Sequence, residues 1–292
     1  MTEHRKGLLA GVLAYALWGG VAAYWKLLAG VGAIELIAHR ALWALGAFAL
    51  LVALSGQLAP LGRALRDLRV LGVMTLSGAL LAVNWGIFVW ATISGHLLDA
   101  SLGYFINPLI SVALGTIFLR ERLSRLQWIA IALAAAGVAI LTWRAGGVPW
   151  VALILAFTFG AYGLVRKTAR VDALVGSTVE TVLMVPFALG YLLWIADRGA
   201  LGHADLAMHL LLVGTGIVTA VPLVLFTVAA RRLPLSTVGF LQYLAPTGQF
   251  LLAAIAFGEP VSVDRLLAFV VIWTGLAVFS FDLWRRRPAA AP

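Results

Sequence analysis

The sequence predicts an all-α integral membrane protein with ten transmembrane helices built from two inverted five-helix repeats. Three observations predict it: the composition, ten long apolar segments and an internal repeat. Of the 292 residues, 63% are hydrophobic and 11% are charged, whereas a soluble domain carries about 25% charged residues. So few charges could not cover a soluble surface, so the chain is expected to lie in a membrane.

Ten apolar segments are long enough to cross a bilayer, which takes about 20 helical residues. They cover residues 7–28, 34–55, 70–93, 101–119, 126–143, 148–166, 175–196, 208–230, 235–257 and 263–284. Their apolar runs are continuous rather than alternating, which favours helices over a closed barrel. The first run has no small-residue cleavage site and is interpreted as a retained helix, not a signal peptide.

The distribution of Lys and Arg predicts the orientation, because cytoplasmic loops carry an excess of these residues. One set of loops holds sixteen of the 21: Arg5, Lys6, Arg63, Arg66, Arg69, Arg120, Arg122, Arg125, Arg166, Lys167, Arg170, Arg231, Arg232, Arg285, Arg286 and Arg287. The opposite loops hold Lys26, Arg144, Arg198 and Arg265. Both termini are therefore expected in the cytoplasm. The net charge of +9 is interpreted as this topology signal, with no nucleic-acid partner.

A repeat relates the two halves of the chain. A shift of 138 residues, or 141 near the N-terminus, brings like residues together: Gly19 and Gly160, Gly78 and Gly216, Phe88 and Phe226, Pro108 and Pro246, Glu121 and Glu259, and Gly137 and Gly275. Each half has five spans, so the second copy enters the membrane from the opposite side. This inverted repeat is common in secondary transporters, with the substrate site near the midplane. The expected units are residues 1–144 and 145–292.

Among the charged residues and histidines, three are selected because they lie well inside a predicted span rather than at its end, and a charge at the bilayer centre costs about 2.5–3.5 kcal/mol on insertion scales. His39 and Arg40 lie in the second span, and either bind a ligand or gate a path, or simply reach outward or to a neighbouring backbone. Glu180 lies similarly deep in the seventh span, and the 141-residue shift aligns it with His39. Glu180 and His39 are the proton-coupling candidates; for Glu180 the alternative is pairing with an arginine at the cytoplasmic rim.

Polar stripes beside prolines mark two further spans. Tyr104 and Asn107 share one helical face beside Pro108, which frees a backbone carbonyl, and Gln242 precedes Pro246 in the same way. These stripes either line a cavity or form hydrogen bonds between helices.

Asn84 in the third span has the same two interpretations. Tyr15 and Trp18 lie deep in the first span and either line a ligand pocket or fill the core. Glu121, just after the fourth span, is expected to have a structural role with neighbouring loop groups.

Several kinds of chemistry have no residues to perform them. The chain contains no cysteine, no phosphate-binding loop and no second intramembrane histidine at metal-ligand spacing. No catalytic residue, metal or cofactor is expected, and the protein is not expected to be an enzyme.

Five segments resemble the RarD branch of the EamA-type transporters, in the drug/metabolite transporter superfamily: "AHRALW" (Ala38–Trp43), "NWGIFVWA" (Asn84–Ala91), "ASLGYFINPL" (Ala100–Leu109), "YGLVRK" (Tyr162–Lys167) and "LSTVGFLQYLAPT" (Leu235–Thr247). The resemblance covers about residues 7 to 284. It implies ten spans, two inverted EamA repeats, a central cavity, a bacterial inner membrane and export of small metabolites or drugs. The superfamily's Gly-Glu pair is present as Gly258-Glu259, but the first half has Arg120-Glu121 instead.

The sequence and the resemblance together predict a secondary transporter, an exporter working by alternating access, coupled to protons or to a counter-substrate. The alternative is a passive channel, which would allow downhill flux only. The expected partners are the bilayer, an amino-acid-like, aromatic or amphenicol-like substrate, and a second copy in a homodimer. Arg40 would attract a carboxylate or another electronegative group. The predicted substrate-binding residues are Arg40, His39, Asn84, Tyr104, Asn107, Gln242, Trp18 and Tyr15.

Overall fold

The computed structural model describes residues 2–28, 30–93, 97–143, 150–203, 205–252, 255 and 263–285, and these residues form helices and turns without strands. The helices are α1 Glu3–Leu27, α2 Ala33–Leu54, α3 Leu58–Ala64, α4 Leu68–Ile93, α5 Leu97–Phe118, α6 Arg125–Trp143, α7 Trp150–Thr168, α8 Ala173–Trp194, α9 Ala200–His203, α10 Leu206–Arg232, α11 Leu235–Gln242, α12 Leu244–Leu251 and α13 Val263–Arg285.

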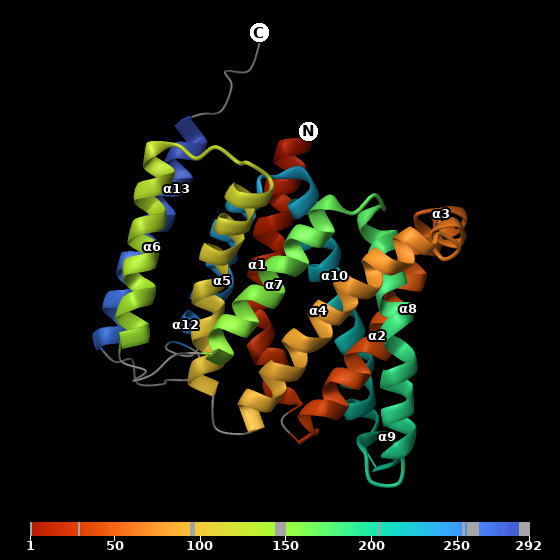
Figure 1. Ribbon diagram of the computed structural model, residues 1–292. Helices are drawn as coiled ribbons and strands as arrows, with labels where there is room; N and C mark the ends of the chain where they lie inside the picture. Colours follow the sequence, from red (N-terminus) through yellow and green to blue (C-terminus); the bar gives the residue numbers. More distant parts are fainter. Residues whose placement is uncertain are drawn as a thin grey trace.

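Ten crossings of the membrane are built from these helices, as predicted. Seven helices are long and apolar enough to cross by themselves: α1, α2, α4, α7, α8, α10 and α13. Helices α5 and α6 contain the shorter apolar stretches Gly103–Phe118 and Arg125–Ile140. Helices α11 and α12 follow one another as a single bent span, and the short helices α3 and α9 lie in connections (Figure 1).

The bend in the ninth span follows from its proline. Pro246 has no N–H to donate to the carbonyl of Gln242, four residues earlier. The chain turns at Tyr243, between α11 and α12. The start of α11 is held by Glu121, whose carboxylate accepts hydrogen bonds from Ser236 N (3.0 Å) and Ser236 Oγ (2.7 Å). This confirms a structural role for Glu121, whereas Gly258-Glu259 lies outside the described residues.

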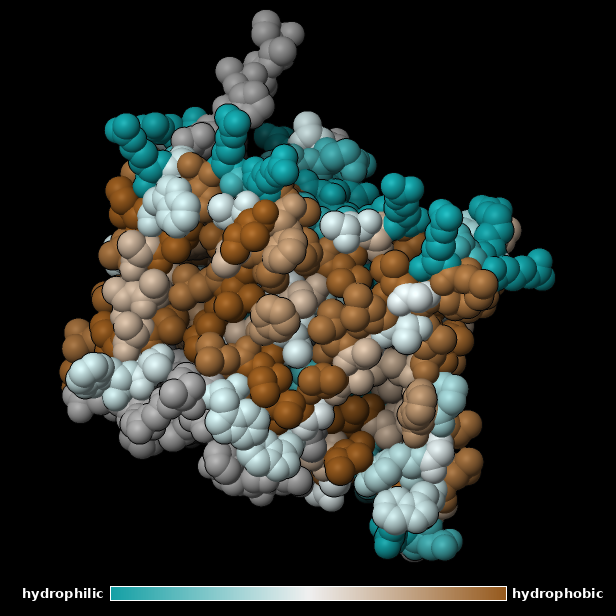
Figure 2. Space-filling view, viewed as in Figure 1, coloured by the Kyte–Doolittle hydropathy of each residue, from teal (hydrophilic) through white to brown (hydrophobic). Residues whose placement is uncertain are grey.

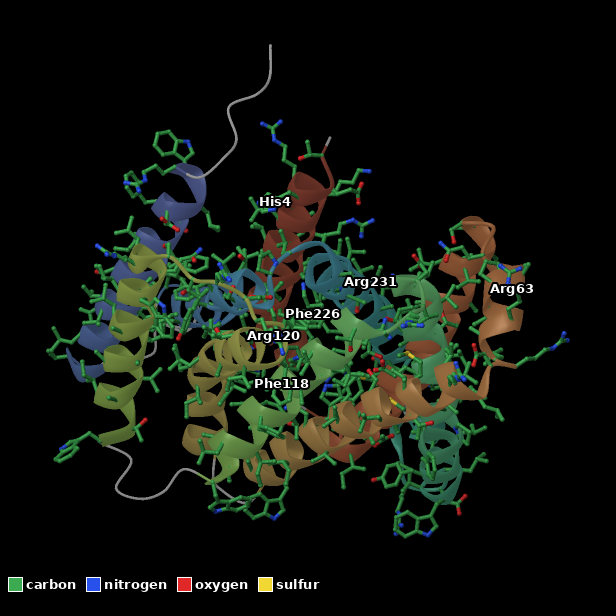
Figure 3. The ribbon with its side chains drawn as sticks, turned by 45° about the horizontal axis from the view of Figure 1, so that its top comes forward. His4, Arg63, Phe118, Arg120, Phe226 and Arg231 are labelled. Atoms are coloured by element: carbon green, nitrogen blue, oxygen red, sulfur yellow. The ribbon has the colours of Figure 1, made fainter. Side chains whose placement is uncertain are left out.

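The surface divides into an apolar band and a polar end. Figure 2 shows hydrophobic side chains around the middle of the molecule and hydrophilic ones gathered at the end where the N-terminus lies. Figure 3 brings that end forward and labels His4, Arg63, Arg120 and Arg231 there. Large apolar side chains such as Phe187, 81% exposed, cover the band. An exposed apolar band of this kind suits contact with lipid tails.

The repeat appears in the helix packing. Helix α1 begins at the polar end, whereas α7, its counterpart in the second half, ends there (Figure 1). Contacts between the halves occur in pairs that the repeat relates. The α1–α10 contact corresponds to α4–α7, the α5–α7 contact to α1–α12, and the α2–α10 contact to α4–α8. The pairs α2–α8, α5–α11 and α6–α13 join counterparts directly. The helices of the two halves therefore interleave instead of forming separate bodies.

Close contacts at glycines repeat the same relation. A Cβ at Gly78 would lie 3.4 Å from Cγ of Glu180 and 3.7 Å from Cγ of Met184. A Cβ at Gly216, the counterpart of Gly78, would overlap the backbone of Trp43, and the 141-residue shift aligns Trp43 with Met184. Helices α2 and α8 thus approach their glycine partners through equivalent positions, and the approach at Gly216 leaves no room for a side chain.

Candidate functional site: a polar cavity between α2, α4, α8 and α10

A narrow cavity lies among helices α2, α4, α8 and α10. The space within it is about 10 Å³, enough for about one water molecule. Its walls combine apolar side chains with hydroxyl groups and one carboxylate. The lining residues are Ala41, Ala44, Leu81, Trp85, Ser177, Glu180, Thr181, Met184, Thr219 and Leu223.

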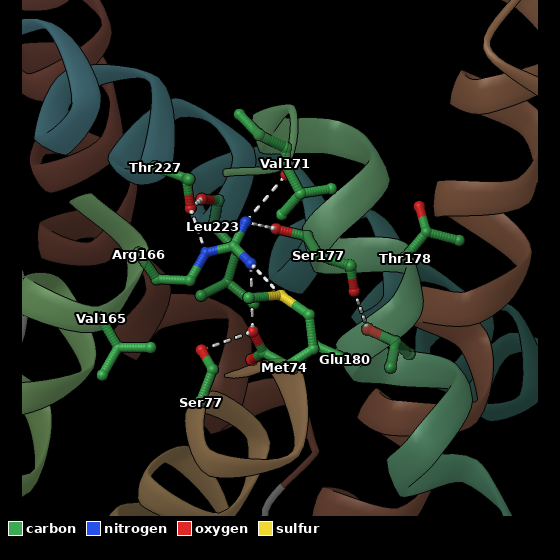
Figure 4. Close-up of polar contacts among 12 residues, drawn as sticks. Met74, Ser77, Val165, Arg166, Val171, Ser177, Thr178, Glu180, Leu223 and Thr227 are labelled. Carbon is green, nitrogen blue, oxygen red and sulfur yellow. Dashed lines mark hydrogen bonds and ion pairs between the residues drawn. The ribbon is translucent and has the colours of Figure 1, made fainter. Parts of the chain in front are cut away.

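On the side of the cavity nearer the polar end, Glu180 belongs to a buried ion pair (Figure 4). The side chain of Glu180 is 4% exposed, and its Oε2 lies 3.5 Å from Nη1 of Arg166. Ser77 on α4 donates its hydroxyl hydrogen to the same oxygen at 2.9 Å. The negative charge of Glu180 is therefore matched by a cation from α7 and by a hydrogen bond from α4.

Arg166 is the centre of this group. Its guanidinium donates to the carbonyl of Ala173 (2.9 Å) and Oγ of Ser177 (3.0 Å) on α8, and to Oγ1 of Thr227 (3.4 Å) on α10. Sδ of Met74 on α4 lies 2.9 Å from Nη1. We call these residues, with Glu180 and Ser77, the Arg166 cluster. The Arg166 cluster joins α4, α7, α8 and α10 on one side of the cavity.

The position of Arg166 corrects an expectation from the sequence, which counted it among the loop residues. Its side chain is only 1% exposed although it lies in the last turn of α7. The physical reason is that Glu180 and several acceptors offer a buried guanidinium all the partners it needs. Its neighbour Lys167 turns instead to the backbone carbonyl of Ala230, at 3.0 Å.

On the other side of the cavity, Arg40 of α2 lies among aromatic rings. Its guanidinium carbon is 4.8 Å from the ring centroid of Trp25 and 4.6 Å from that of Trp85, over the ring faces. Its Nε donates to Oγ1 of Thr219 at 3.2 Å. Tyr104 lies close enough to Arg40 for an electrostatic interaction. We call Arg40, Trp25, Trp85 and Thr219 the Arg40 site.

The charge of Arg40 has no balancing carboxylate in the described part of the chain, where none lies within ion-pair distance of its guanidinium. Its Nη atoms donate no hydrogen bond to the described residues. Trp85 and Thr219 both line the cavity, so the guanidinium stands at its edge. A cation is thus held inside the membrane-spanning region by two indole faces and one hydroxyl.

His39, next to Arg40, faces a different environment and is fully buried. Its Nδ1 accepts a hydrogen bond from Nε1 of Trp43 at 3.3 Å. Its Nε2 lies 3.8 Å from Oε1 of Glu35 and has no hydrogen-bond partner among the described residues. Oε1 of Glu35 also accepts from the backbone N–H of Ala200 in α9. His39 is therefore linked through Glu35 to the connection between α8 and α10, and it is not among the residues that line the cavity.

The two charged regions occupy equivalent positions in the repeat. Arg40 and Glu180 each lie seven residues after the start of their helix, about 10 Å from its end at 1.5 Å per residue. The 141-residue shift aligns His39 with Glu180 and Trp25 with Arg166. One cavity therefore has a charged group on each side, placed by the same pair of helices, α2 and α8.

The profile of the EamA-like transporter family matches the chain twice, over residues 5–143 and 147–281. The chain belongs to the EamA-like transporter family. It is 49% identical to an uncharacterized transporter of Pseudomonas aeruginosa, over 96% of this chain and 95% of the relative. It is 43% identical to protein RarD of Escherichia coli K12, with 96% and 95% covered. These relatives place it in the RarD branch, as the sequence segments predicted.

More distant comparisons agree. The chloramphenicol-sensitive protein RarD of Pseudomonas aeruginosa is 32% identical, over 95% of this chain and 94% of the relative. A solved crystal structure has the same fold with a TM-score of 0.75 at 20% identity, covering 98% of this chain and 100% of the other. The protein is therefore a multi-pass bacterial membrane transporter, and its family implies a small-molecule substrate.

The remaining polar residues predicted for this EamA-like transporter lie away from the cavity walls. The amide of Asn84 donates to the carbonyl of Leu155 and to Oγ1 of Thr158 on α7, both at 2.9 Å. These bonds correspond to the structural interpretation of Asn84. Asn107 is buried with its Oδ1 unpartnered among the described residues, and Gln242 is buried at the end of α11. A binding role for these three residues stays a prediction.

Tyr15 and Trp18 pack in the protein core and are not among the residues that line the cavity. Their ring centroids are 5.5 Å apart, and both contact Phe226 of α10, at 6.3 and 5.9 Å. Trp18 also meets Phe159 of α7 edge-on at 5.9 Å. The aromatic cluster joins α1, α7 and α10, which is the core-filling interpretation of these residues.

The residues that sequence reasoning did not select are Arg166, Trp25, Trp85 and Thr219. Arg166 comes at the end of a mainly apolar span, and the sequence does not show that its side chain turns inward. Trp25 lies at the end of a span, where tryptophan is typical of the membrane interface. Trp85 is one of many tryptophans, and Thr219 is one of several hydroxyl residues in its helix. Selecting either would have required knowing which helix faces contact Arg40.

Proposed function

We propose that this EamA-like transporter exports small molecules by alternating access through the cavity between α2, α4, α8 and α10. The proposal rests on one observation above the others: a narrow cavity lies between the saturated Arg166 cluster and the unbalanced Arg40. A cavity with room for about one water molecule suits a carrier, because a solute can pass only when the surrounding helices move.

The polar end of the molecule is proposed to face the cytoplasm of the bacterial inner membrane, with both termini on that side. The basic residues gathered there support this orientation through the positive-inside rule. Arg166 lies in the last turn of α7, at this end. In this arrangement the Arg166 cluster is the cytoplasmic closure, and the cavity is approached from the periplasmic side, past Arg40.

The moving bodies are proposed to combine helices from both repeats. Residues 1–144 and 145–292 remain the proposed repeat units, but helices from each pack extensively against the other. Rocking one repeat against the other would break these contacts. Motion of α4, α5 and α7 against α1, α10 and α12 would preserve the α1–α10, α1–α12, α4–α7 and α5–α7 contacts, and the two groups are related by the repeat.

Glu180 is proposed to carry the coupling proton. It lines the cavity and it is the only carboxylate bound to Arg166 among the described residues. A proton on Glu180 would remove the negative charge that faces Arg166. The cluster would then lose its ion pair and α4 would separate from α7 and α8 more easily. His39, fully buried beside Glu35, is the second candidate because imidazole changes charge near neutral pH.

The test uses purified protein in liposomes, with chloramphenicol, phenylalanine and benzoate as radiolabelled solutes. Alternating access coupled to protons predicts that an imposed pH gradient drives one of them to accumulate above its external concentration and above its level in protein-free liposomes, which corrects for benzoic acid that crosses the bilayer by itself. Glu180→Gln should lose this accumulation but keep solute exchange. Flux that only equalises concentrations, and ignores the pH gradient, would identify a passive channel and refute the proposal.

A further inference from the structure

Arg40 differs from the buried Arg166 because it is only partly buried and its charge is unbalanced. The Arg166 cluster shows how this protein treats a buried guanidinium that has no ligand to bind: it supplies a carboxylate, two hydroxyls and a carbonyl. For Arg40 it supplies one hydroxyl and two indole faces. A charge inside a membrane-spanning helix is costly without a partner, so a position that retains one is a candidate binding site.

The contacts of Arg40 also determine which of its N–H groups remain available to a ligand. The ring faces of Trp25 and Trp85 lie against the guanidinium, and Nε is occupied by Thr219. Such contacts hold the cation without using its Nη hydrogens. The four Nη hydrogens form the fork that matches the two oxygens of a carboxylate. Lysine offers no equivalent planar fork.

The charge of the cavity specifies the ligand further. The one carboxylate of the cavity wall, Glu180, is already neutralised by Arg166. The net charge of the two regions is therefore the single positive charge of Arg40. A ligand with one negative charge makes the complex neutral, whereas a zwitterion leaves the positive charge in place.

The size and the walls of the cavity complete the description. The space open between these walls is about 10 Å³, room for about one water molecule, so the walls must separate to admit a solute. Ala41, Ala44, Leu81 and Leu223 give apolar walls, and Ser177 and Thr181 add hydroxyl groups. These walls fit a compact, mainly apolar body.

We propose that the substrate class of this transporter is small organic monocarboxylates, with the carboxylate bound edge-on by the Nη atoms of Arg40 and the apolar body against α2, α4 and α10. This inference rests on the proposed function and narrows its range of solutes. Arg40 is then a specificity-determining residue, and Trp25, Trp85 and Thr219 position its guanidinium.

The test compares four probes on purified protein: benzoate, its neutral isostere benzamide, zwitterionic phenylalanine and inorganic phosphate. Binding is followed by calorimetry and by the change in tryptophan fluorescence, to which Trp25 and Trp85 contribute among the eleven tryptophans of the chain. Benzoate should bind at least about tenfold more tightly than benzamide, since a charge-assisted hydrogen-bonded pair is at stake. Arg40→Met should abolish the difference, Arg40→Lys should retain only part of it, and Arg231→Met, a basic residue far from the cavity, should leave it unchanged.

Several results would overturn the inference. Equal binding of benzoate and benzamide, or a preference that survives in Arg40→Met, would remove Arg40 as the carboxylate site. Tighter binding of phenylalanine or phosphate than of benzoate would reject monocarboxylates as the class. If Arg40→Met fails to fold, the affinities of the probes for the wild-type protein and for Arg40→Lys still test whether Arg40 binds the carboxylate. Accumulation of benzamide in liposomes would refute only this inference, whereas benzoate binding without any transport would refute only the proposed function.

Discussion

Two arginines inside the membrane-spanning region, the buried Arg166 and the partly buried Arg40, lie on opposite sides of one cavity and have opposite environments. Arg166 is saturated by an ion pair and hydrogen bonds from three helices, and its side chain is 1% exposed. Arg40 is held by indole faces and a single hydroxyl, at the edge of the cavity. The difference teaches that burial alone does not assign a role: a satisfied charge stabilises a conformation, whereas an unsatisfied one is available to a ligand.

The largest expected effect tests the structural side of this comparison. Arg166→Met should destabilise the folded protein by about 3–5 kcal/mol, because it leaves the carboxylate of Glu180 buried without its cation. The measurement is the unfolding midpoint in detergent. Arg166→Met/Glu180→Gln should recover part of the loss, since no charge is then left alone. Equal stability of Arg166→Met and the wild-type protein would show that the ion pair contributes nothing.

A smaller effect is expected from the space that Arg166 occupies. A Cβ at Gly176 would lie 2.7 Å from Nη1 of Arg166 and 2.9 Å from Cγ1 of Val171. Gly176→Ala should therefore cost about 1–3 kcal/mol of unfolding free energy through overpacking. A Cβ at Gly190, in the same helix, would meet no atom of the described residues within 4 Å, so Gly190→Ala is the matched control. It should be neutral or stabilising, because alanine favours helices, and a similar loss in both variants would argue against a specific contact.

Arg40→Met should change stability by no more than about 1 kcal/mol, because it removes one hydrogen bond and two exposed-edge cation–π contacts while relieving an unbalanced charge. The same unfolding assay used for Arg166→Met provides the comparison. Transport should be lost even though the fold is retained. A loss of stability as large as that of Arg166→Met would remove the distinction between the two arginines.

The smallest effects concern the residues that hold the Arg40 guanidinium. Thr219→Val keeps the shape of the side chain but removes the acceptor for Nε, and Trp85→Phe offers a weaker ring face. Each should weaken benzoate binding only a few-fold, in line with interaction energies of about 0.5–1.5 kcal/mol. Calorimetric titration measures the change. Unaltered affinity in both variants would mean that Arg40 needs no positioning.

The fold was predictable because its causes are repeated along the chain. Each apolar segment contains many apolar residues, and the excess of basic residues is spread over several loops. The predicted spans and their orientation therefore depend on no single residue. Gly78 and Gly216 are equivalent positions of the repeat in the sequence, and they pack against equivalent positions of α8 and α2 in the structure. The break after Gln242 follows from Pro246 by local backbone chemistry alone.

The site was predictable only where a charge interrupts an apolar segment. Arg40, His39 and Glu180 were selected on that ground, and Arg40 and Glu180 lie on two sides of the same cavity. Arg166 was not, because an arginine in the last turn of a helix resembles a loop residue until its partner is known. The pairing of Asn84 with α7 was equally out of reach, since the sequence gives the polar group but not which helix faces it.

Alternating access itself is tested most directly by single cysteines, which the absence of native cysteine makes free of background. Ala41→Cys and Ser177→Cys place a thiol on opposite walls of the cavity, the second within the Arg166 cluster. Their reaction with a membrane-impermeant thiol reagent is measured from each side of oriented vesicles, with and without benzoate and a pH gradient. At rest, we predict that the cysteine at position 41 reacts only from the membrane side opposite the termini. Under transport conditions its reaction should become slower, and the cysteine at position 177 should react from the side on which the termini lie. Reaction of both cysteines from both sides at once, or rates that transport conditions leave unchanged, would contradict the account.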